Sequence, residues 1–154
     1  MKFNKITIAL LLVFTVSSIQ SNAQKTHIIR LNVDTGKITK QTVNTYANFG
    51  QTNGVSNINY NTYVGIGDYV KWVGVSSSSR SDIVSIKSIN HQGGARVFGK
   101  NVLRGHGGEV VGKVTQGKPG QYEKYTVKFH VYINGVRKSG TFIIDPKLTI
   151  KTNR

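Results

Sequence analysis

Residues 124–144 constrain the fold of this chain more than any other segment, because they encode a β-hairpin through both the strands and the turn. Apolar residues alternate with polar ones along the first half, at Tyr125, Val127, Phe129, Val131 and Ile133. A period of two is typical of a strand with one buried face. Asn134-Gly135 follows, and both residues accept the positive φ of a two-residue hairpin turn. We therefore predict a hairpin that pairs Ile133 with Val136, and so places Val127 opposite Phe142 and Tyr125 opposite Ile144.

The rest of the chain shows short β-rich runs separated by Gly, Asn, Asp and Ser, and no apolar periodicity of the helical kind. The predicted strands cover residues 27–33, 37–46, 69–75, 83–89 and 147–152. Asp34-Thr35-Gly36 is interpreted as a hairpin turn with a left-handed glycine, 48–61 as a long loop or weak edge, and 76–81 as a polar connector. Val70, Trp72, Leu148 and Ile150 are expected in the core. These elements predict an all-β fold: a single β-sandwich of about seven to eight mostly antiparallel strands.

The first 23 residues have the layout of a secretory signal peptide. Lys2 and Lys5 precede the apolar run 6–16, which is too short to span a bilayer, and small residues lead to a cleavage site after Ala23. We predict a signal peptide at 1–23 and one β-sandwich domain at 24–154, with no transmembrane segment after the signal. The protein is expected to be secreted or periplasmic. Without cysteine at the cleavage site it is not expected to be a lipoprotein, and it has no disulfide partner.

One part of the chain resembles a known fold family. The order Gly67-Asp68-Tyr69-Val70-Lys71-Trp72, the Pro119-Gly120-Gln121-Tyr122 approach to a long strand, and the segment 140–144 resemble cupredoxins. Similar patterns occur in immunoglobulin-like sandwiches, so the resemblance implies a cupredoxin-like or immunoglobulin-like topology. Blue copper requires a cysteine thiolate, which this chain lacks. The resemblance therefore implies no electron transfer, and we predict no cofactor.

The glycine-rich segment 90–109 is interpreted as a flexible β-connection that needs positive φ at several positions, or as a loop that brings backbone N–H groups close to a ligand. It contains Arg96, Lys100 and Arg104, together with His91, His106 and Glu109. The first three suit an anion. The last three are acceptable metal ligands, which makes a metal-binding protein an alternative function.

The net charge of +15 is the remaining functional indication, and it fits either a binding surface or a solvated surface that only confers solubility. Loss of Lys2 and Lys5 with the signal lowers it by only two, so the basic character belongs to the folded domain. Lys124, Lys128 and Tyr132 share one strand face, and the hairpin register places Arg137 opposite Tyr132 and Ser139 opposite His130. A basic face with an aromatic member is suited to a polyanion.

The six acids are scattered, and the serines at 76–79 lack a nucleophile elbow, so an enzyme is the least favoured class. We predict a non-catalytic binding or interaction module for an anionic glycan, lipopolysaccharide or nucleic acid, or another cell-surface component. The predicted polyanion site consists of Arg96, Lys100, Arg104, Lys124, Lys128, Arg137 and Tyr132.

Overall fold

The structure is a computed structural model that describes residues 24–152. The predicted signal peptide therefore lies outside the described residues. Within the described range, no helix has the length and hydropathy to cross a membrane.

The described chain is mostly β-structure, as predicted. Its strands are β1 (Thr26–Val33), β2 (Ala47–Asn48), β3 (Asn61–Val64), β4 (Tyr69–Ser76), β5 (Ile83–Gly94), β6 (Val102–Arg104), β7 (Val110–Lys113), β8 (Tyr122–Ile133), β9 (Val136–Arg137), β10 (Phe142–Ile144) and β11 (Lys147–Ile150). These outnumber the predicted seven or eight, because strands of two to four residues are too short to show an alternating pattern. Two helical turns, α1 (Val43–Tyr46) and η1 (Asn57–Asn59), were not predicted.

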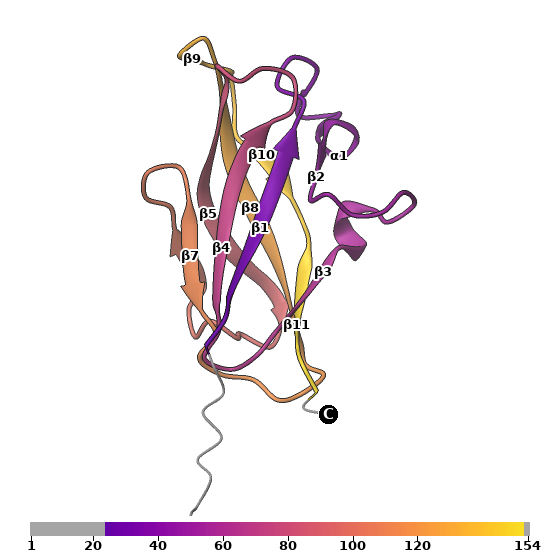
Figure 1. The fold of residues 1–154 in the computed structure, drawn as a ribbon, viewed down its shortest axis with the longest axis vertical. Coiled ribbons are helices and arrows are strands. Elements are labelled where there is room, and N and C mark those ends of the chain that lie inside the picture. The colour runs from indigo at the N-terminus through magenta and orange to yellow at the C-terminus, as the bar shows by residue number, and fades with distance from the viewer. Residues whose placement is uncertain (1–23, 153–154) are drawn as a thin grey trace, which may run out of the picture.

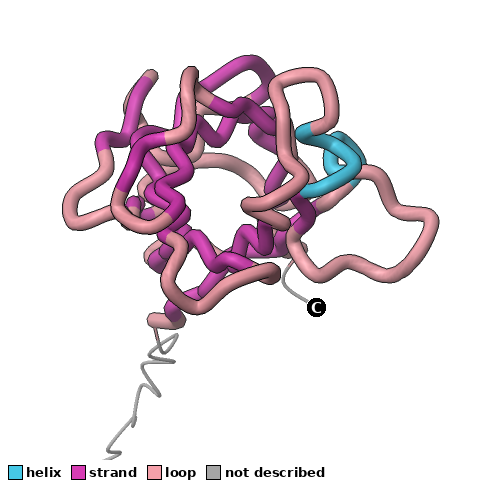
Figure 2. The backbone as a smooth tube through the Cα atoms, turned by 90° about the horizontal axis from the view of Figure 1, so that it is seen from above, coloured by secondary structure: helices cyan, strands magenta, loops and turns pink. Residues whose placement is uncertain are grey.

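The strands form two mixed sheets around one core (Figure 1). Sheet A has the order β2-β1-β4-β7, and sheet B has the order β3-β11-β8-β5-β6, with β9 and β10 also paired to β8. All pairings are antiparallel except β1 with β4 and β11 with β3. Figure 2 shows the helical turns and their adjoining loop to one side of the strands.

The core lies between the two sheets and contains the predicted tryptophan. Trp72 of β4 is 1% exposed, and its Nε1–H donates to the hydroxyl of Tyr125 on β8 across the core, at 3.1 Å. The two rings meet edge to face, with centroids 5.6 Å apart. Val70, Leu148 and Ile150 are also buried, as predicted. The period-two pattern therefore identified the inward faces of β4, β8 and β11 correctly.

The C-terminal hairpin forms, but its register changes along its length. Asn134 and Gly135 both have positive φ, and Ile133 pairs with Val136, as predicted. Beyond this point Phe142 pairs with Phe129 instead of Val127. The shift amounts to two residues, so the predicted apolar face is kept although the predicted partners are wrong. By the same shift Thr141, rather than Ser139, contacts His130, at 3.1 Å.

The predicted hairpin at Asp34-Thr35-Gly36 is wrong. Strand β1 pairs in parallel with β4, and residues 37–46 form a turn region that includes α1. Gly36 does not have a positive φ. The side chain of Thr35 is fully buried, and it is bonded to residues more than 40 positions away. Contacts of this range leave no trace in a local pattern.

Candidate ligand-binding face

Strand β8 runs through the middle of sheet B and presents polar side chains on the outer face of that sheet. Tyr125, Val127, Phe129 and Val131 are all fully buried. Successive side chains of a strand point to opposite faces, so the residues next to these four in the sequence point outward. These are Lys124, Thr126, Lys128, His130 and Tyr132. Three members of the predicted polyanion site, Lys124, Lys128 and Tyr132, therefore share one face.

The glycine-rich segment 90–109 is not a single loop. It contains the end of β5, the whole of β6 and a tight turn closed by a bridge between His106 and Glu109. Ser88 of β5 pairs with Lys128 on one side and with Arg104 of β6 on the other. Directly paired residues share a face, so Arg104 joins the cations of β8.

Further cations extend this face toward both ends. Lys147 of β11 pairs with Lys124, and Arg137 of β9 pairs with Tyr132. Lys87 lies at a bulge in β5 and close to His130. Of these, Arg137 was predicted, whereas Lys87 and Lys147 were not. Lys147 could have been found from its alternation with buried Leu148.

Arg96 and Lys100 lie elsewhere. Both are exposed in the segment between β5 and β6, outside the strands of sheet B. Arg96 and Lys118 line a hollow of about 300 Å3, and the Gln116 side-chain amide donates to the Arg96 carbonyl at 2.7 Å. The structure thus brings five of the seven predicted residues onto one sheet face and places two beyond its strands.

The cations of the outer face have no acidic partner within the described residues. The ion pairs found there are His27–Asp68, Lys37–Asp34, Lys71–Glu109 and His91–Glu123. None involves Arg104, Lys124, Lys128, Arg137 or Lys147. Their positive charge is therefore available to a ligand.

Asp145 is an acid whose backbone position lies on this face. It lies between β10 and β11. Both strands pair with β8 in one continuous register, which places Asp145 opposite Thr126. Within residues 24–152, Asp145 Oδ1 and Thr126 Oγ1 are both buried without a hydrogen-bond partner. Asp145 lowers the positive charge at the middle of the face, between the rows of Lys124 and Lys128.

His130 is held in its neutral form on this face. Burial, followed by the charges of Arg137 and Lys87, lowers the pKa of His130 below its ordinary value. Its Nε2 then accepts from Arg137 Nη2 at 2.9 Å. His130 therefore positions Arg137 and adds no charge at neutral pH.

The predicted metal ligands are not brought together. His91 Nδ1 lies 2.9 Å from Glu123 Oε1, and Glu109 pairs with Lys71 at 2.7 Å. The turn of His106 contacts β5 near Ile86, five residues from His91, or about 16 Å along a strand. Residues 24–152 hold no group of three or more His, Cys, Asp or Glu side chains arranged for a metal ion.

Glu123 is a buried acid that the sequence interpretation missed. It points inward from β8 and is 1% exposed, and its Oε2 accepts from the Val97 amide at 2.7 Å. Burial raises the pKa of Glu123 above its ordinary value, against the opposing effect of its bonds to His91 and Val97. The signal was present in the sequence, because position 123 continues the inward series of Tyr125 and Val127. The bond from the Val97 amide attaches the segment after β5 to the core, and the pair with His91 joins the end of β5 to β8.

A second histidine–carboxylate pair joins β1 to the turn before β4. His27 Nε2 donates to Asp68 Oδ2 at 2.7 Å, and the amides of Gly65 and Lys25 also donate to this carboxylate. Burial raises the pKa of Asp68, but these hydrogen bonds outweigh it, so the pKa lies below its ordinary value. The contact of Asp68 with His27 was not predicted.

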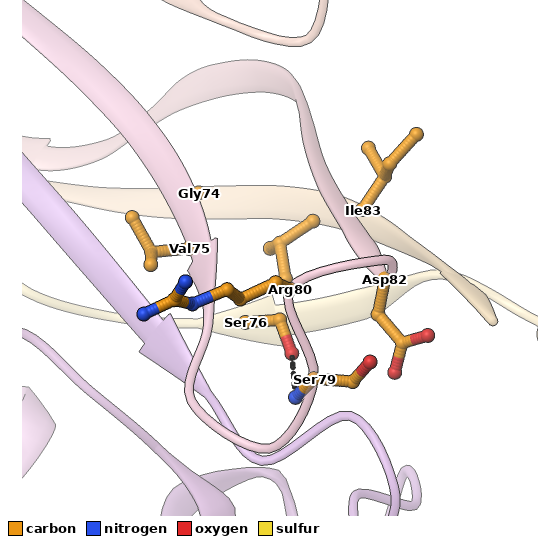
Figure 3. Close-up of a pocket in the computed structure, with 8 residues that line it drawn as sticks. Gly74, Val75, Ser76, Ser79, Arg80, Asp82 and Ile83 are labelled. Atoms are coloured by element: carbon orange, nitrogen blue, oxygen red, sulfur yellow. Dashed lines mark hydrogen bonds between the residues drawn. The ribbon is translucent and has the colours of Figure 1, made fainter. Parts of the chain in front are cut away.

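A polar cluster closes the end of the molecule where β1 stops and β5 begins. Thr35 Oγ1 donates to Asp82 Oδ2 at 2.5 Å and lies 2.7 Å from Ser78 Oγ. Lys138 Nζ donates to the Thr35 carbonyl at 3.1 Å. Figure 3 shows the adjoining hollow of about 390 Å3 at the β4–β5 turn, lined by Arg80 and Asp82 among others. The mutual bonding of these groups indicates that they hold loops together.

The two sheets and the core between them make this an all-β fold. The chain is similar to the PixA inclusion body protein of Burkholderia cenocepacia J2315, with a TM-score of 0.60 and 16% identity, over 85% of this chain and 98% of the other. At this identity the likeness concerns the fold alone.

Two further solved structures are more distant. The N-terminal domain of ORF48 of phage TP901-1 matches with a TM-score of 0.37 and 8% identity, covering 84% of this chain and 100% of the other. The cysteine protease inhibitor EhICP2 of Entamoeba histolytica matches with a TM-score of 0.31 and 11% identity, covering 84% and 98%. Comparison with protein-family models and with curated protein sequences gave no match.

Proposed function

We propose that this protein is an exported, non-catalytic binding module that holds an anionic polymer on the outer face of sheet B. The observation that supports this function is the group of cations on that face, which have no acidic partner within residues 24–152. Neighbouring positive charges attract a polymer with regularly spaced negative charges, and binding releases its counterions. Anionic polysaccharide, lipopolysaccharide and nucleic acid all have this chemistry.

The spread of the cations over several strands also favours a polymer over a small ligand. Rows of paired residues run across β6, β5, β8 and β11, so the charges spread over several strands. An extended polymer can contact several rows at once. Each contact holds the neighbouring unit of the polymer close to the next row of cations.

Retention on a heparin column tests this function. We expect Lys124→Gln/Lys128→Gln to elute at a clearly lower salt concentration than the unmodified protein. The matched control is Arg30→Gln/Lys113→Gln, which removes the same charge from strands of sheet A. If the two variants shift equally, net charge alone explains retention. If the unmodified protein passes through unretained at about 50 mM salt, the proposed function is wrong.

Export is part of the proposal and has its own test. It is supported by the charged start, apolar run and small residues that precede Gln24. Intact-mass measurement on protein from the culture medium or periplasm is expected to show a chain that begins at Gln24. A cell-retained protein that keeps residues 1–23 would contradict export. The cupredoxin-like or immunoglobulin-like topology stays a prediction.

A further inference from the structure

Two exposed tyrosines lie at one end of the same face. Thr149 of β11 pairs with Tyr63 of β3 on one side and with Tyr122 of β8 on the other. Tyr63 is 58% exposed and Tyr122 is 52% exposed. Neighbouring strands lie about 4.8 Å apart, so the attachment points of the two side chains are about 10 Å apart. Burial of Val64, Leu148 and Glu123 fixes all three side chains of this row on the outer face.

A hollow lies beside Tyr63. It has a volume of about 220 Å3 and is lined by Tyr63, Gly120, Thr149, Ile150, Lys151 and Thr152. Sites for drug-sized molecules enclose roughly 300–1,000 Å3, so this hollow suits a smaller unit, such as a single sugar ring of a polymer. Its lining combines an aromatic ring, two threonines and a lysine.

The next row of the sheet supplies charge and an amide. Asn61 pairs with Lys147, which in turn pairs with Lys124. Thr149 Oγ1 donates to Asn61 Oδ1 at 2.9 Å, which joins the tyrosine row to the lysine row. Aromatic rings, hydroxyl and amide groups, and cations therefore occur together within two adjacent rows.

We infer that Tyr63 and Tyr122 form a sugar-stacking subsite at the end of the basic face, and that the polymer bound there is an anionic polysaccharide. The inference rests on the proposed function and names its substrate class. The apolar C–H face of a pyranose ring packs on the face of a tyrosine ring, the threonines and Asn61 bind sugar hydroxyls, and the lysines bind carboxylate or sulfate groups. The lining of the hollow contains no Asn, Gln, Asp or Glu side chain to pair with base edges, and Asn61 of the adjacent row already accepts from Thr149. Stacking of bases on the tyrosines is the alternative that the oligonucleotide probe tests.

Titration calorimetry with three probes tests the inference. The probes are a hyaluronan oligosaccharide, a single-stranded oligothymidylate and linear polyphosphate, matched in the number of charges. Polyphosphate has charge but no ring, so it measures the cations alone. We expect Tyr63→Ala/Tyr122→Ala to weaken binding of the oligosaccharide about tenfold and of polyphosphate less than about twofold. Tyr63→Phe is expected to keep most of the affinity, because the ring face remains.

Each other outcome has a distinct meaning. Equal weakening for all three probes would overturn the sugar subsite, because it would show that the substitutions disturb binding to the whole basic face. Preferential loss of the oligonucleotide would show that the tyrosines stack on bases, and would also overturn the inference. Unchanged oligosaccharide binding would overturn it while the polyanion function stands. If none of the probes binds the unmodified protein, the proposed function itself fails.

Discussion

Replacing Tyr125 by Phe tests whether the hydrogen bond across the core stabilises the sandwich. In the structure Trp72 Nε1–H donates to the Tyr125 hydroxyl at 3.1 Å, and both side chains are buried. Removal of the hydroxyl leaves the ring packing in place but deprives the indole N–H of its partner. A buried donor without a partner costs about 1–3 kcal/mol. We expect the free energy of unfolding of Tyr125→Phe to fall by that amount.

Urea unfolding followed by fluorescence measures this change, because Trp72 is the single tryptophan in the sequence and reports on its own surroundings. The slope of free energy against urea is expected to stay constant, which would show that the change lies in stability. Tyr122→Phe, at an exposed tyrosine on the same strand, is the control and is expected to change stability by less than about 0.5 kcal/mol. Equal stability of Tyr125→Phe and the unmodified protein would refute the reasoning.

Three further predictions concern acid stability, packing between the sheets and ligand affinity. Because the pKa of Asp68 is lowered in the fold, its contribution is present above the ordinary carboxyl pKa and is lost as pH falls through the lowered value. Asp68→Asn should therefore lower the free energy of unfolding by about 1–3 kcal/mol at neutral pH, and the difference from the unmodified protein should disappear in acid. Urea unfolding across a pH series measures this, and a difference that stays constant with pH would contradict it. A Cβ on Gly74 would overlap the carbonyl of Val84, so Gly74→Ala should lose about 1–3 kcal/mol of stability in thermal melts. Gly93→Ala is the control and should be nearly neutral, because a Cβ there would have nothing within 4 Å among the described residues. Asp145→Asn removes an acid from the basic face and should raise heparin affinity a few-fold, which corresponds to less than about 1 kcal/mol. Elution at an unchanged or lower salt concentration would contradict heparin binding at that face.

Local pattern predicted the strands that have a clear inward face. Alternation along 124–133 identified the buried side of β8, and Asn134-Gly135 identified the turn. The period-two pattern even survived the register error, because a shift of two residues returns each side chain to the same face. The same pattern failed for 37–46. Ile38 and Val43 are buried there, but they lie in a turn region and not in a strand.

The basic face was predicted in part for the same reason. Lys124, Lys128 and Tyr132 lie on one strand, so their common face follows from alternation alone. Arg104 was assigned to a loop, although it joins this face through its pairing with Ser88 in β5. Tyr63 was missed, because only the parallel pairing of β3 with β11 brings it to the face. Lys147 was missed although it alternates with buried Leu148 on β11, which pairs with β8.

The sequence by itself determined that this chain forms strands, where its clearest turn lies, which side chains of β8 point inward, and that the chain is strongly basic. These properties depend on the pleat of a strand and on the φ preferences of single residues, which act within a few positions. Tertiary structure alone decided that β1 lies parallel to β4, that Glu123 bonds to His91, and that cations and tyrosines from six strands share one face. Strand order depends on burial summed over the whole core, in which each contact contributes little, so no short segment of sequence encodes it.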